Sequence, residues 1–337
     1  PAQKPLLLLV DGHSLAFRSF YAFSKGGEGG LSTKEGVPTS VTYGFLKALL
    51  DNCKGLAPQG VVIAFDTAEP TFRHVADEAY KAHRDTAPEH FFADLANLQT
   101  ILEDSLDIPL CMAPGYEADD VLGTLANRAA NQGWRVRILS GDRDLFQLVD
   151  DERDIAVLYM GGGPYAKNSG PSEIRREGVI AKLGVTPEEV VDLKALTGDS
   201  SDNIPGVKGV GPKTAINLLQ AYTNLDGIYG ALAELQAAGP KAKDPQHFGR
   251  IAPQGADQPR FIAVILGVNL GQARQNAVAS AQGSIALLRH DQNARPFGRH
   301  ARFQRDGEQI AVGIGGQHFQ HGHGGQGIGI VIMPRGA

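Results

Sequence analysis

The sequence predicts an α/β protein built on a parallel, doubly wound sheet. Short apolar runs with strand character alternate with longer segments of helical periodicity through the first half of the chain. Strands that alternate with helices lie parallel in one sheet, because each helix carries the chain back across a face of that sheet. The predicted strands are residues 5–11, 60–66, 108–112, 135–139 and 155–159.

Helical patterns fill most of the segments between and after these strands. The predicted helices of the first half lie at residues 15–23, 39–52, 91–106 and 145–149. Residues 25–38 are rich in glycine and residues 67–89 are polar, so both segments are interpreted as loops. Beyond the fifth strand, residues 172–197 predict two helices that are separated at Gly184 and resume after Pro187.

Length, composition and charge narrow the classes of protein to which the chain can belong. The chain has 337 residues, enough for one large or two ordinary domains, and no apolar run approaches the length of a membrane span. The two cysteines, Cys53 and Cys111, lack metal-ligand spacing, which indicates a reducing, cytoplasmic setting. Residues 1–243 carry a net charge of −9 and residues 244–337 a net charge of +4. An acidic first part argues against a polyanionic partner unless its acids hold cations.

Acidic side chains follow four of the predicted strands. These are Asp11, Asp66, Glu117 and Asp142, with Asp119, Asp120 and Asp144 close by. The carboxyl ends of parallel strands meet at one edge of a sheet, and that edge forms the ligand crevice. A single aspartate there is as readily explained as a helix N-cap. Four such strand ends with three further acids instead predict a divalent metal site, because so many carboxylates need cations to neutralise them.

The acids of residues 113–144 also constrain the local structure. In a helix, Glu117 and Asp120 share a face while Asp119 points away from both. The three converge only if the helix begins at about this point, with Glu117 still in the preceding loop, and the carboxylates then lie at the positive end of the helix dipole. Two cations held by such acids can bind a phosphodiester, lower the pKa of a water molecule and stabilise the leaving oxygen.

A second acidic and glycine-rich stretch spans residues 197–219. It contributes Asp199 and Asp202, followed by a glycine loop at residues 206–211 that opens a helix at Pro212. Glycines let backbone amides approach a phosphate closely, and the start of a helix favours an anion. The alternative is a turn that merely reverses the chain. The neighbouring carboxylates favour phosphate binding.

Six sequence motifs of the chain occur in the order in which a known protein family has them. They are VDGHSLAFRSFYA, VIAFDTAEPTFRH, YKAHR, GYEADDVLGTLA, ILSGDRDLFQLV and LKALTGDSSDNIPGVKGVGPKTA. Over about residues 5–235 the chain resembles the 5′-nuclease family, specifically the 5′→3′ exonuclease domain of bacterial DNA polymerase I of the cyanobacterial type, to which flap endonucleases and phage 5′-exonucleases are related. The resemblance implies a PIN-like sheet flanked by helices, with residues 67–89 at the base of a helical arch and a helix-three-turn-helix at the glycine loop.

The resemblance also assigns roles to individual residues. The first metal cluster would be Asp11, Asp66, Glu117, Asp119 and Asp120, and the second Asp142, Asp144, Asp199 and Asp202. The basic residues that engage the scissile phosphate would be Lys81, Arg84, Arg18 and Lys194. The DNA-binding loop would be Gly206, Val207, Lys208, Gly209, Val210, Gly211, Lys213 and Thr214. For Lys81 and Arg84 the alternative is a solvated surface, which the YKAHR motif argues against.

The implied function is that of a metal-dependent 5′→3′ exonuclease and structure-specific 5′-flap endonuclease, which acts on DNA and RNA primers in replication and repair. It would use two Mg²⁺ or Mn²⁺ ions, with a K⁺ ion at the glycine loop. Its partners would be branched or 5′-flap DNA and RNA–DNA primer junctions, without a membrane. We expect a monomer in the bacterial cytoplasm, associated with the nucleoid. The alternatives are a catalytically silent DNA-junction binding module, an RNA-directed relative and a truncated polymerase I without its polymerase domain.

Three segments are expected. Residues 1–170 would form the α/β nuclease domain and residues 171–243 the helical DNA-binding region. Residues 244–337 depart from the family pattern, because all lysines lie at or before Lys243 and the rest is rich in Gly, Gln, Arg and His. We interpret this tail as irregular, either disordered or translated from a shifted reading frame. A metal-binding role for His318, His321 and His323 is the weaker interpretation.

Overall fold

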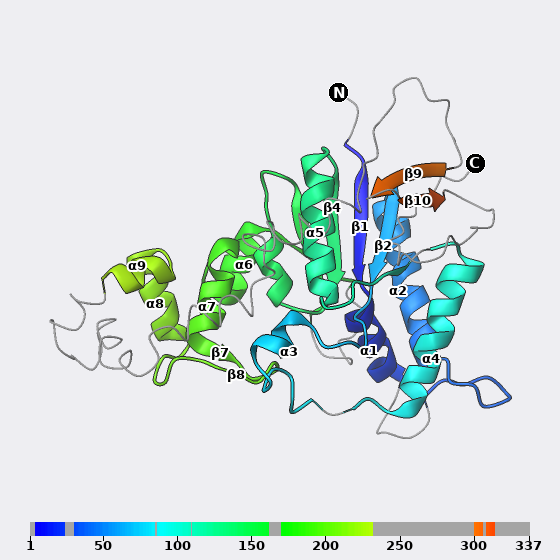
Figure 1. Ribbon diagram of the computed structural model, residues 1–337, viewed down its shortest axis with the longest axis horizontal. Helices are drawn as coiled ribbons and strands as arrows, with labels where there is room; N and C mark the ends of the chain where they lie inside the picture. The colour runs from blue at the N-terminus through cyan, green and yellow to red at the C-terminus, as the bar shows by residue number, and fades with distance from the viewer. Residues whose placement is uncertain are drawn as a thin grey trace.

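The computed structural model describes residues 4–23, 30–84, 86–108, 110–161, 170–231, 300–305 and 308–313. A six-stranded sheet forms the centre of the molecule, in the order β3-β2-β1-β4-β5-β6 (Figure 1). Its strands are β1 (Leu6–Asp11), β2 (Gly60–Ala64), β3 (Leu110–Cys111), β4 (Arg135–Ser140), β5 (Ile155–Tyr159) and β6 (Ser172–Ile174). The first five are mutually parallel, as predicted, and β6 pairs antiparallel with β5.

Strand β6 corrects one prediction, because residues 172–174 were expected to begin a helix. Val157 of β5 lies opposite Ile174, and of the three residues of β6 only Ile174 is buried. A strand of three residues is too short to show the alternation by which strands are recognised. Its conformation is therefore set by pairing with β5.

Helices cover both faces of the sheet. On β1, Leu8 and Val10 belong to one core, whereas Leu7 and Leu9 belong to the other. The first core is completed by α1 (Gly12–Phe23), α2 (Ser40–Leu56) and α4 (Glu89–Thr100), and the second by α5 (Ala118–Asn131) and the helices that follow β6 (Figure 1). This two-sided burial explains why β1 reads as a continuous apolar run.

Helix α1 begins directly after β1, without an intervening loop. A Cβ atom at Gly12 would lie 2.5 Å from the ring of Phe65 and 2.7 Å from the carbonyl oxygen of Ala64, so the first helical position must be glycine. Helix α4 continues into the π-helical turn η2 (Ile101–Ser105). Together, α4 and η2 correspond to the helix predicted at residues 91–106. The polar segment before α4 also contains a short helix, α3 (Phe72–Ala76), where only a loop was expected.

The helical region after β6 follows the predicted breaks. Helix α6 (Arg176–Leu183) ends at Gly184, which adopts φ 79°, and a capping box at Thr186 starts the 3₁₀ turn η4 (Pro187–Glu189). Then come α7 (Val190–Thr197), the paired two-residue strands β7 (Gly198–Asp199) and β8 (Ile204–Pro205), α8 (Pro212–Tyr222) and α9 (Leu225–Gly230). The 3₁₀ helix η3 (Asp144–Leu148) occupies the helix predicted after β4.

Part of the tail is ordered into strands. β9 (His300–Arg305) and β10 (Glu308–Gly313) pair antiparallel, and the irregular character of the rest of the tail stays a prediction. The sequence signal that was missed is Asp306-Gly307, a pair typical of two-residue hairpin connections. The remainder of 244–337, including His318, His321 and His323, lies outside the described residues. Within the described parts, no helix has the length and apolar character needed to cross a membrane.

Candidate active site

The acids predicted from the strand ends lie at the carboxyl edge of the sheet. Asp11 is the last residue of β1, and Asp66 and Asp142 each lie two residues beyond the ends of β2 and β4. Strand β1 lies between β2 and β4, which lead away in opposite directions through the sheet. The carboxyl ends of β1 and β4 therefore flank the topological switch point, where parallel sheets open a crevice.

Ser140, at the end of β4, connects two of these acids. Its hydroxyl donates to Asp11 Oδ2 at 2.6 Å and accepts the backbone N–H of Asp142 at 2.9 Å. The other oxygen of Asp11 accepts the N–H of Ser14 at 3.0 Å. Ser140 is fully buried, so its hydroxyl has a fixed orientation. This serine was not among the residues predicted from the sequence.

The carboxylates at this edge of the sheet raise one another's pKa values by electrostatic repulsion. Burial raises the pKa of Asp11 to about 7, and the charges of Asp142 and Asp66 add to the effect. Burial also raises the pKa of Asp119 well above its usual range, together with the charges of Asp11, Asp142, Asp66 and Glu117. Asp142 raises the pKa of Asp144 as well. The resemblance assigned Asp142 to the second cluster, but its charge acts on both groups.

Helix α5 begins where the acids of the sequence required it to begin. Glu117 is its N-cap residue, and its backbone N–H donates to Asp120 Oδ2 at 3.1 Å in a capping box. Asp66 Oδ1 accepts the N–H of Ala118 at 2.7 Å, so Asp66 also lies at the positive end of this helix. His13, which was not singled out, contacts Asp66 from α1 with its Nδ1 3.3 Å from Asp66 Oδ2.

Residues 80–84 bring basic and phenolic groups onto these acids. Lys81 Nζ lies 2.7 Å from Glu117 Oε1, and Arg84 Nη2 lies 2.5 Å from Asp202 Oδ1. The hydroxyl of Tyr80 lies 3.1 Å from both Glu117 Oε2 and Asp202 Oδ2. Lys81 and Arg84 therefore face carboxylates rather than solvent alone, and their contact with a phosphate stays a prediction. Tyr80 was missed because sequence gave no reason to distinguish it from a core aromatic.

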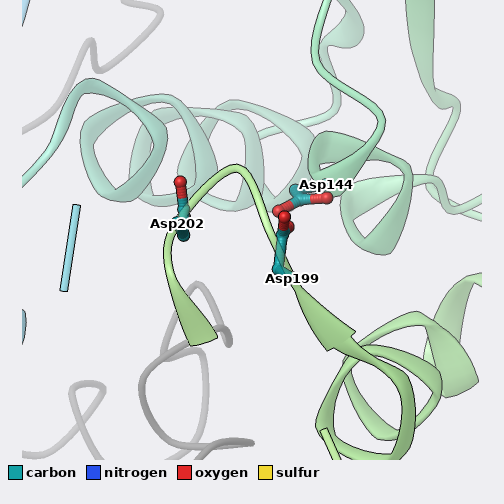
Figure 2. Close-up of side chains that lie close together, drawn as sticks. All are labelled: Asp144, Asp199 and Asp202. Carbon is teal, nitrogen blue, oxygen red and sulfur yellow. The ribbon is translucent and has the colours of Figure 1, made fainter. Parts of the chain in front are cut away.

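The tightest acidic cluster consists of Asp144, Asp199 and Asp202 (Figure 2). Each offers a carboxylate oxygen, and these oxygens lie within 4.8 Å of one another. Asp144 starts η3, whereas Asp199 ends β7 and Asp202 lies in the connection from β7 to β8. An all-oxygen donor set of this kind fits Mg²⁺ or Mn²⁺. In the described part of the chain, no other three acids meet this distance.

Lys194 neutralises part of this cluster from α7. Its Nζ lies 2.7 Å from Asp144 Oδ1 and 2.5 Å from Asp199 Oδ2. Burial opposes a charged lysine, but the two carboxylates outweigh burial and raise its pKa. Burial raises the pKa of Asp144 to about 6 despite Lys194, whereas hydrogen bonds from Lys194 and Ser201 hold the pKa of Asp199 below its usual value.

Asp120 and Arg18, which the resemblance also assigned to the site, have partners outside the acidic clusters. Both oxygens of Asp120 bind the guanidinium of Arg73, at 2.6 and 2.9 Å. Arg73 is buried and was missed, although it belongs to one of the quoted motifs. Arg18 of α1 donates to the carbonyl oxygen of Met160, just beyond β5, at 2.8 Å. Arg18 thus lies near the edge of the sheet, but with a backbone partner.

The glycine loop separates into core-facing and exposed residues. Val210 is buried and Val207 packs against the same core, so these two side chains hold the loop in place. Lys208 and Lys213 are exposed, Thr214 is half-buried, and Gly209 adopts φ 84°. Gly211 is the N-cap of α8, and Pro212 occupies its first turn, as predicted. The surface offered to a ligand therefore consists of the backbone of Gly206, Gly209 and Gly211 with the two lysines.

Comparison with known proteins agrees with this geometry. Residues 6–184 match the family described as the 5′-3′ exonuclease, N-terminal resolvase-like domain, and residues 185–247 match the 5′-3′ exonuclease, C-terminal SAM fold. DNA polymerase I of Synechocystis is 52% identical over 237 residues, which cover 70% of this chain and 24% of that protein. Thermostable DNA polymerase I of Thermus thermophilus is 43% identical over 244 residues, covering 72% and 27%. The chain thus spans about a quarter of the length of these relatives.

Solved structures show the same fold. Bacteriophage T5 5′-exonuclease with bound divalent metal ions (zinc) superposes with a TM-score of 0.63 at 20% identity, covering 82% of this chain and 93% of that one. A T5 flap endonuclease complex with DNA and metal ions gives a TM-score of 0.62 at 19% identity with the same coverage. Because both family matches lie in consecutive order along residues 6–247, the chain belongs to the 5′-3′ exonuclease family.

Proposed function

We propose that this chain hydrolyses phosphodiester bonds at 5′ ends of DNA, as a 5′→3′ exonuclease and a structure-specific 5′-flap endonuclease. The single observation that carries the proposal is the cluster of Asp144, Asp199 and Asp202, whose carboxylate oxygens lie within 4.8 Å of one another beside Lys194. Such a cluster at the edge of a parallel sheet suits the binding of divalent cations and phosphate. The products would be a 5′-phosphate and a 3′-hydroxyl.

The carboxylates would hold two Mg²⁺ or Mn²⁺ ions. Asp144, Asp199 and Asp202, together with Asp142, would form one site, and Asp11, Asp66 and Asp119 the core of the other. When bound, such ions activate a water molecule and stabilise the leaving oxygen. The protein's own contribution is to hold the acids in a fixed array, through Ser140 at Asp11 and the N-terminus of α5 at Asp66.

Basic residues would stabilise the phosphate as negative charge builds on it. Lys81, Arg84 and Lys194 each lie within 2.7 Å of an acid of the site. Once cations neutralise those acids, the same ammonium and guanidinium groups are the nearest donors for an incoming phosphate. Fixed donors of this kind act most strongly where charge develops in the transition state. Arg18, at the rim of the sheet, is proposed to contact the strand that enters the site.

The glycine loop would hold the duplex next to the cleaved strand. Exposed Lys208 and Lys213 and the backbone amides of residues 206–211 can bind successive phosphates without reading bases. A K⁺ ion at this loop belongs to the proposal, as do 5′-flap DNA and RNA–DNA primer junctions as substrates. The proposed setting is a monomer in the bacterial cytoplasm, consistent with the bacterial origin of the relatives.

The test is a comparison of cleavage and binding in the Asp119→Asn variant. Removing one carboxylate dismantles a metal site but does not weaken attraction to a polyanion, so cleavage of a 5′-flap substrate in Mg²⁺ should be abolished while flap affinity is kept. Asp51→Asn on the exposed face of α2 is the matched control and should cleave normally. Normal cleavage by Asp119→Asn would refute the metal assignment. An unsubstituted chain that binds flaps without cleaving them would instead be a silent junction-binding module.

A further inference from the structure

The ion pair between Arg73 and Asp120 engages both oxygens of the carboxylate. Arg73 Nη1 lies 2.6 Å from Asp120 Oδ2, and Nη2 lies 2.9 Å from Oδ1. The same Oδ2 also accepts the backbone N–H of Glu117 at 3.1 Å. A carboxylate offers about four lone-pair sites, so three are already used by the protein itself. A cation at the one remaining site would lie next to the positively charged guanidinium, which would repel it.

Lys81 and Arg84 can leave their carboxylate partners far more easily than Arg73 can leave Asp120. The side chain of Arg84 is 52% exposed and that of Lys81 is 20% exposed, so both can turn toward solvent or a phosphate. The side chain of Arg73 is only 3% exposed, and its guanidinium lies 4.5 Å from the centre of the Phe72 ring. A buried guanidinium without its carboxylate would be an uncompensated charge. The Arg73–Asp120 pair is therefore a permanent part of the fold.

The pair joins two elements that carry site residues. Arg73 belongs to α3, which leads into Tyr80 and Lys81, and Asp120 belongs to the first turn of α5, which begins after Glu117. Arg73 Nη1 also lies 4.0 Å from Glu117 Oε2. A second link runs alongside, because the N–H of Phe72 donates to the carbonyl oxygen of Gly115 at 3.0 Å. Through these contacts α3 is held against the start of α5.

We propose that Asp120 is not a metal ligand, contrary to the assignment by resemblance, and that Arg73 and Asp120 are a positioning pair for Glu117 and Lys81. The inference rests on the proposed function, since it concerns how that metal centre is arranged. Asp119, one residue earlier on the helix, projects from a different side of α5 than Asp120. Of the two neighbouring aspartates, Asp120 is the one that binds Arg73.

The experiment is a double-mutant cycle read by direct Mn²⁺ binding to the full-length chain, with electron paramagnetic resonance giving affinity and stoichiometry. The variants are Arg73→Met, Asp120→Asn and the pair together. A positioning pair predicts that each single variant weakens Mn²⁺ binding by about tenfold, as partners of metal ligands typically do, with stoichiometry unchanged. The double variant should bind no more weakly than the weaker single variant, and its melting temperature should exceed that of Arg73→Met.

If Asp120 is instead a metal ligand, the variants should change Mn²⁺ binding differently. Arg73→Met would then free a carboxylate and leave Mn²⁺ affinity equal or higher, and Asp120→Asn would remove one bound ion. Either result overturns the proposal, as would losses that multiply in the double variant. If Arg73→Met does not fold, Arg73→Lys keeps the charge and loses the two-pronged contact, with weaker binding again expected.

Two controls separate this inference from the proposed function. Asp119→Asn should lose one bound Mn²⁺, and if it binds both ions normally the proposed metal centre is wrong whatever Asp120 does. Arg153→Met breaks a 2.6 Å ion pair with Asp150 and should leave Mn²⁺ binding unchanged. A comparable loss in Arg153→Met would show that any broken ion pair affects the site, and would overturn the specific role of Arg73.

Discussion

Lys81 shows how strongly single residues are constrained at this site. Its backbone adopts φ 56°, in the left-handed region that residues with a side chain rarely occupy. Its N–H donates to the carbonyl oxygen of Asp202 at 2.9 Å, and its ammonium group binds Glu117. Sparsely populated conformations persist only where surrounding contacts enforce them, and they are concentrated at functional sites. The position of the ammonium group is thus set by the backbone as well as by the side chain.

The first prediction concerns the contribution of Lys81 to the rate. If its ammonium group contacts the phosphate as charge develops, Lys81→Ala should lower the single-turnover rate of flap cleavage by about a hundredfold, since one such contact is worth about 3 kcal/mol. Flap affinity should change much less. Lys47→Ala, which removes an exposed lysine of α2, is the control. A rate change below about twofold in Lys81→Ala would make Lys81 an ordinary surface lysine.

A second prediction follows from the raised pKa values of the acids. A carboxyl group whose pKa is higher in the folded state binds its proton more tightly there than in the unfolded chain. Its stabilising contribution is complete below the ordinary pKa of 3.8 and is lost as the pH rises to about 6 for Asp144 and about 7 for Asp11. Without divalent cations, the free energy of unfolding contributed by these groups should therefore fall between pH 4 and pH 7.

Cations should reverse this loss, because they bind the deprotonated carboxylates. Thermal melting with and without Mg²⁺ should show a larger rise in Tm at pH 8 than at pH 5.5. Asp11→Asn should flatten the pH dependence measured in a chelator. An equal rise in Tm at the two pH values would contradict the pKa assignments.

The acids could be found from sequence, but their partners could not. Asp11, Asp66 and Asp142 follow strands, and the carboxyl edge of a parallel sheet gathers whatever follows its strands. Arg73 and Tyr80 follow no strand, and they reach the site only because tertiary contacts hold α3 and the turn after it over the start of α5. Local periodicity contains no information about such a contact. Side chains that neutralise a site are accordingly harder to predict than the site itself.

Among the elements, the short hairpin of β7 and β8 is tightly restricted by close backbone contacts. Gly198 adopts φ 75°, and a Cβ atom on Gly206 would lie 2.2 Å from the carbonyl carbon of Thr197 and 2.5 Å from the nitrogen of Gly198. Two backbone segments thus touch without a side chain between them. This close approach fixes the connection that carries Asp199 and Asp202. The glycine at 206 therefore belongs to the acidic cluster as much as to the glycine loop.

The third prediction tests this contact. Gly206→Ala should push the two backbone segments apart, lower stability by about 2 kcal/mol and weaken Mn²⁺ binding at the Asp144, Asp199 and Asp202 cluster. Gly211→Ala is the matched control, because a Cβ atom there would meet nothing within 4 Å and its φ is −90°. Differential scanning calorimetry and Mn²⁺ titration measure the two effects. Equal behaviour of the two variants would show that the approach of Gly198 and Gly206 is not what holds the cluster.

Helix boundaries were predicted correctly where local residue preferences determine them. The breaks at Gly184 and Pro187 and the start of α8 at Pro212 depend on local backbone preferences, and they lie where expected. β6 was missed because its three residues are strand only by pairing with β5. The α3 helix was missed because its five residues lie in a polar segment without apolar periodicity.

At the scale of the whole molecule, charge is divided along the chain. Residues 1–243 carry a net charge of −9, although this part contains the proposed DNA-binding surface. Two divalent cations would offset four of these charges where the phosphate must approach. Family similarity ends at residue 247, and the part beyond it is the basic part. Composition places a change of residue usage at residue 243, and it did not predict the β9 and β10 hairpin.

The fourth prediction is that a chain ending at residue 247 remains a nuclease. The carboxylate cluster, the basic residues and the glycine loop all precede that point, so flap cleavage per bound complex should be within about twofold of the full chain. Nonspecific DNA binding should weaken and become less dependent on salt, because basic residues that touch phosphates are removed. Loss of cleavage or of cooperative unfolding in the shortened chain would show that residues 248–337 are required by the nuclease fold.

The contacts that complete the acidic centre join residues far apart in sequence. Ser140 binds Asp11 across 129 positions, and Tyr80 binds Asp202 across 122 positions. During synthesis, every strand of the central sheet leaves the ribosome before Asp199 and Asp202, because β6 ends at Ile174. The trio with Asp144 can form only after the β7 and β8 hairpin has left the exit tunnel and docked, at a synthesis rate of about 5–20 residues per second. The order of translation therefore keeps the growing chain from forming the proposed metal site until β7 and β8 have been synthesised.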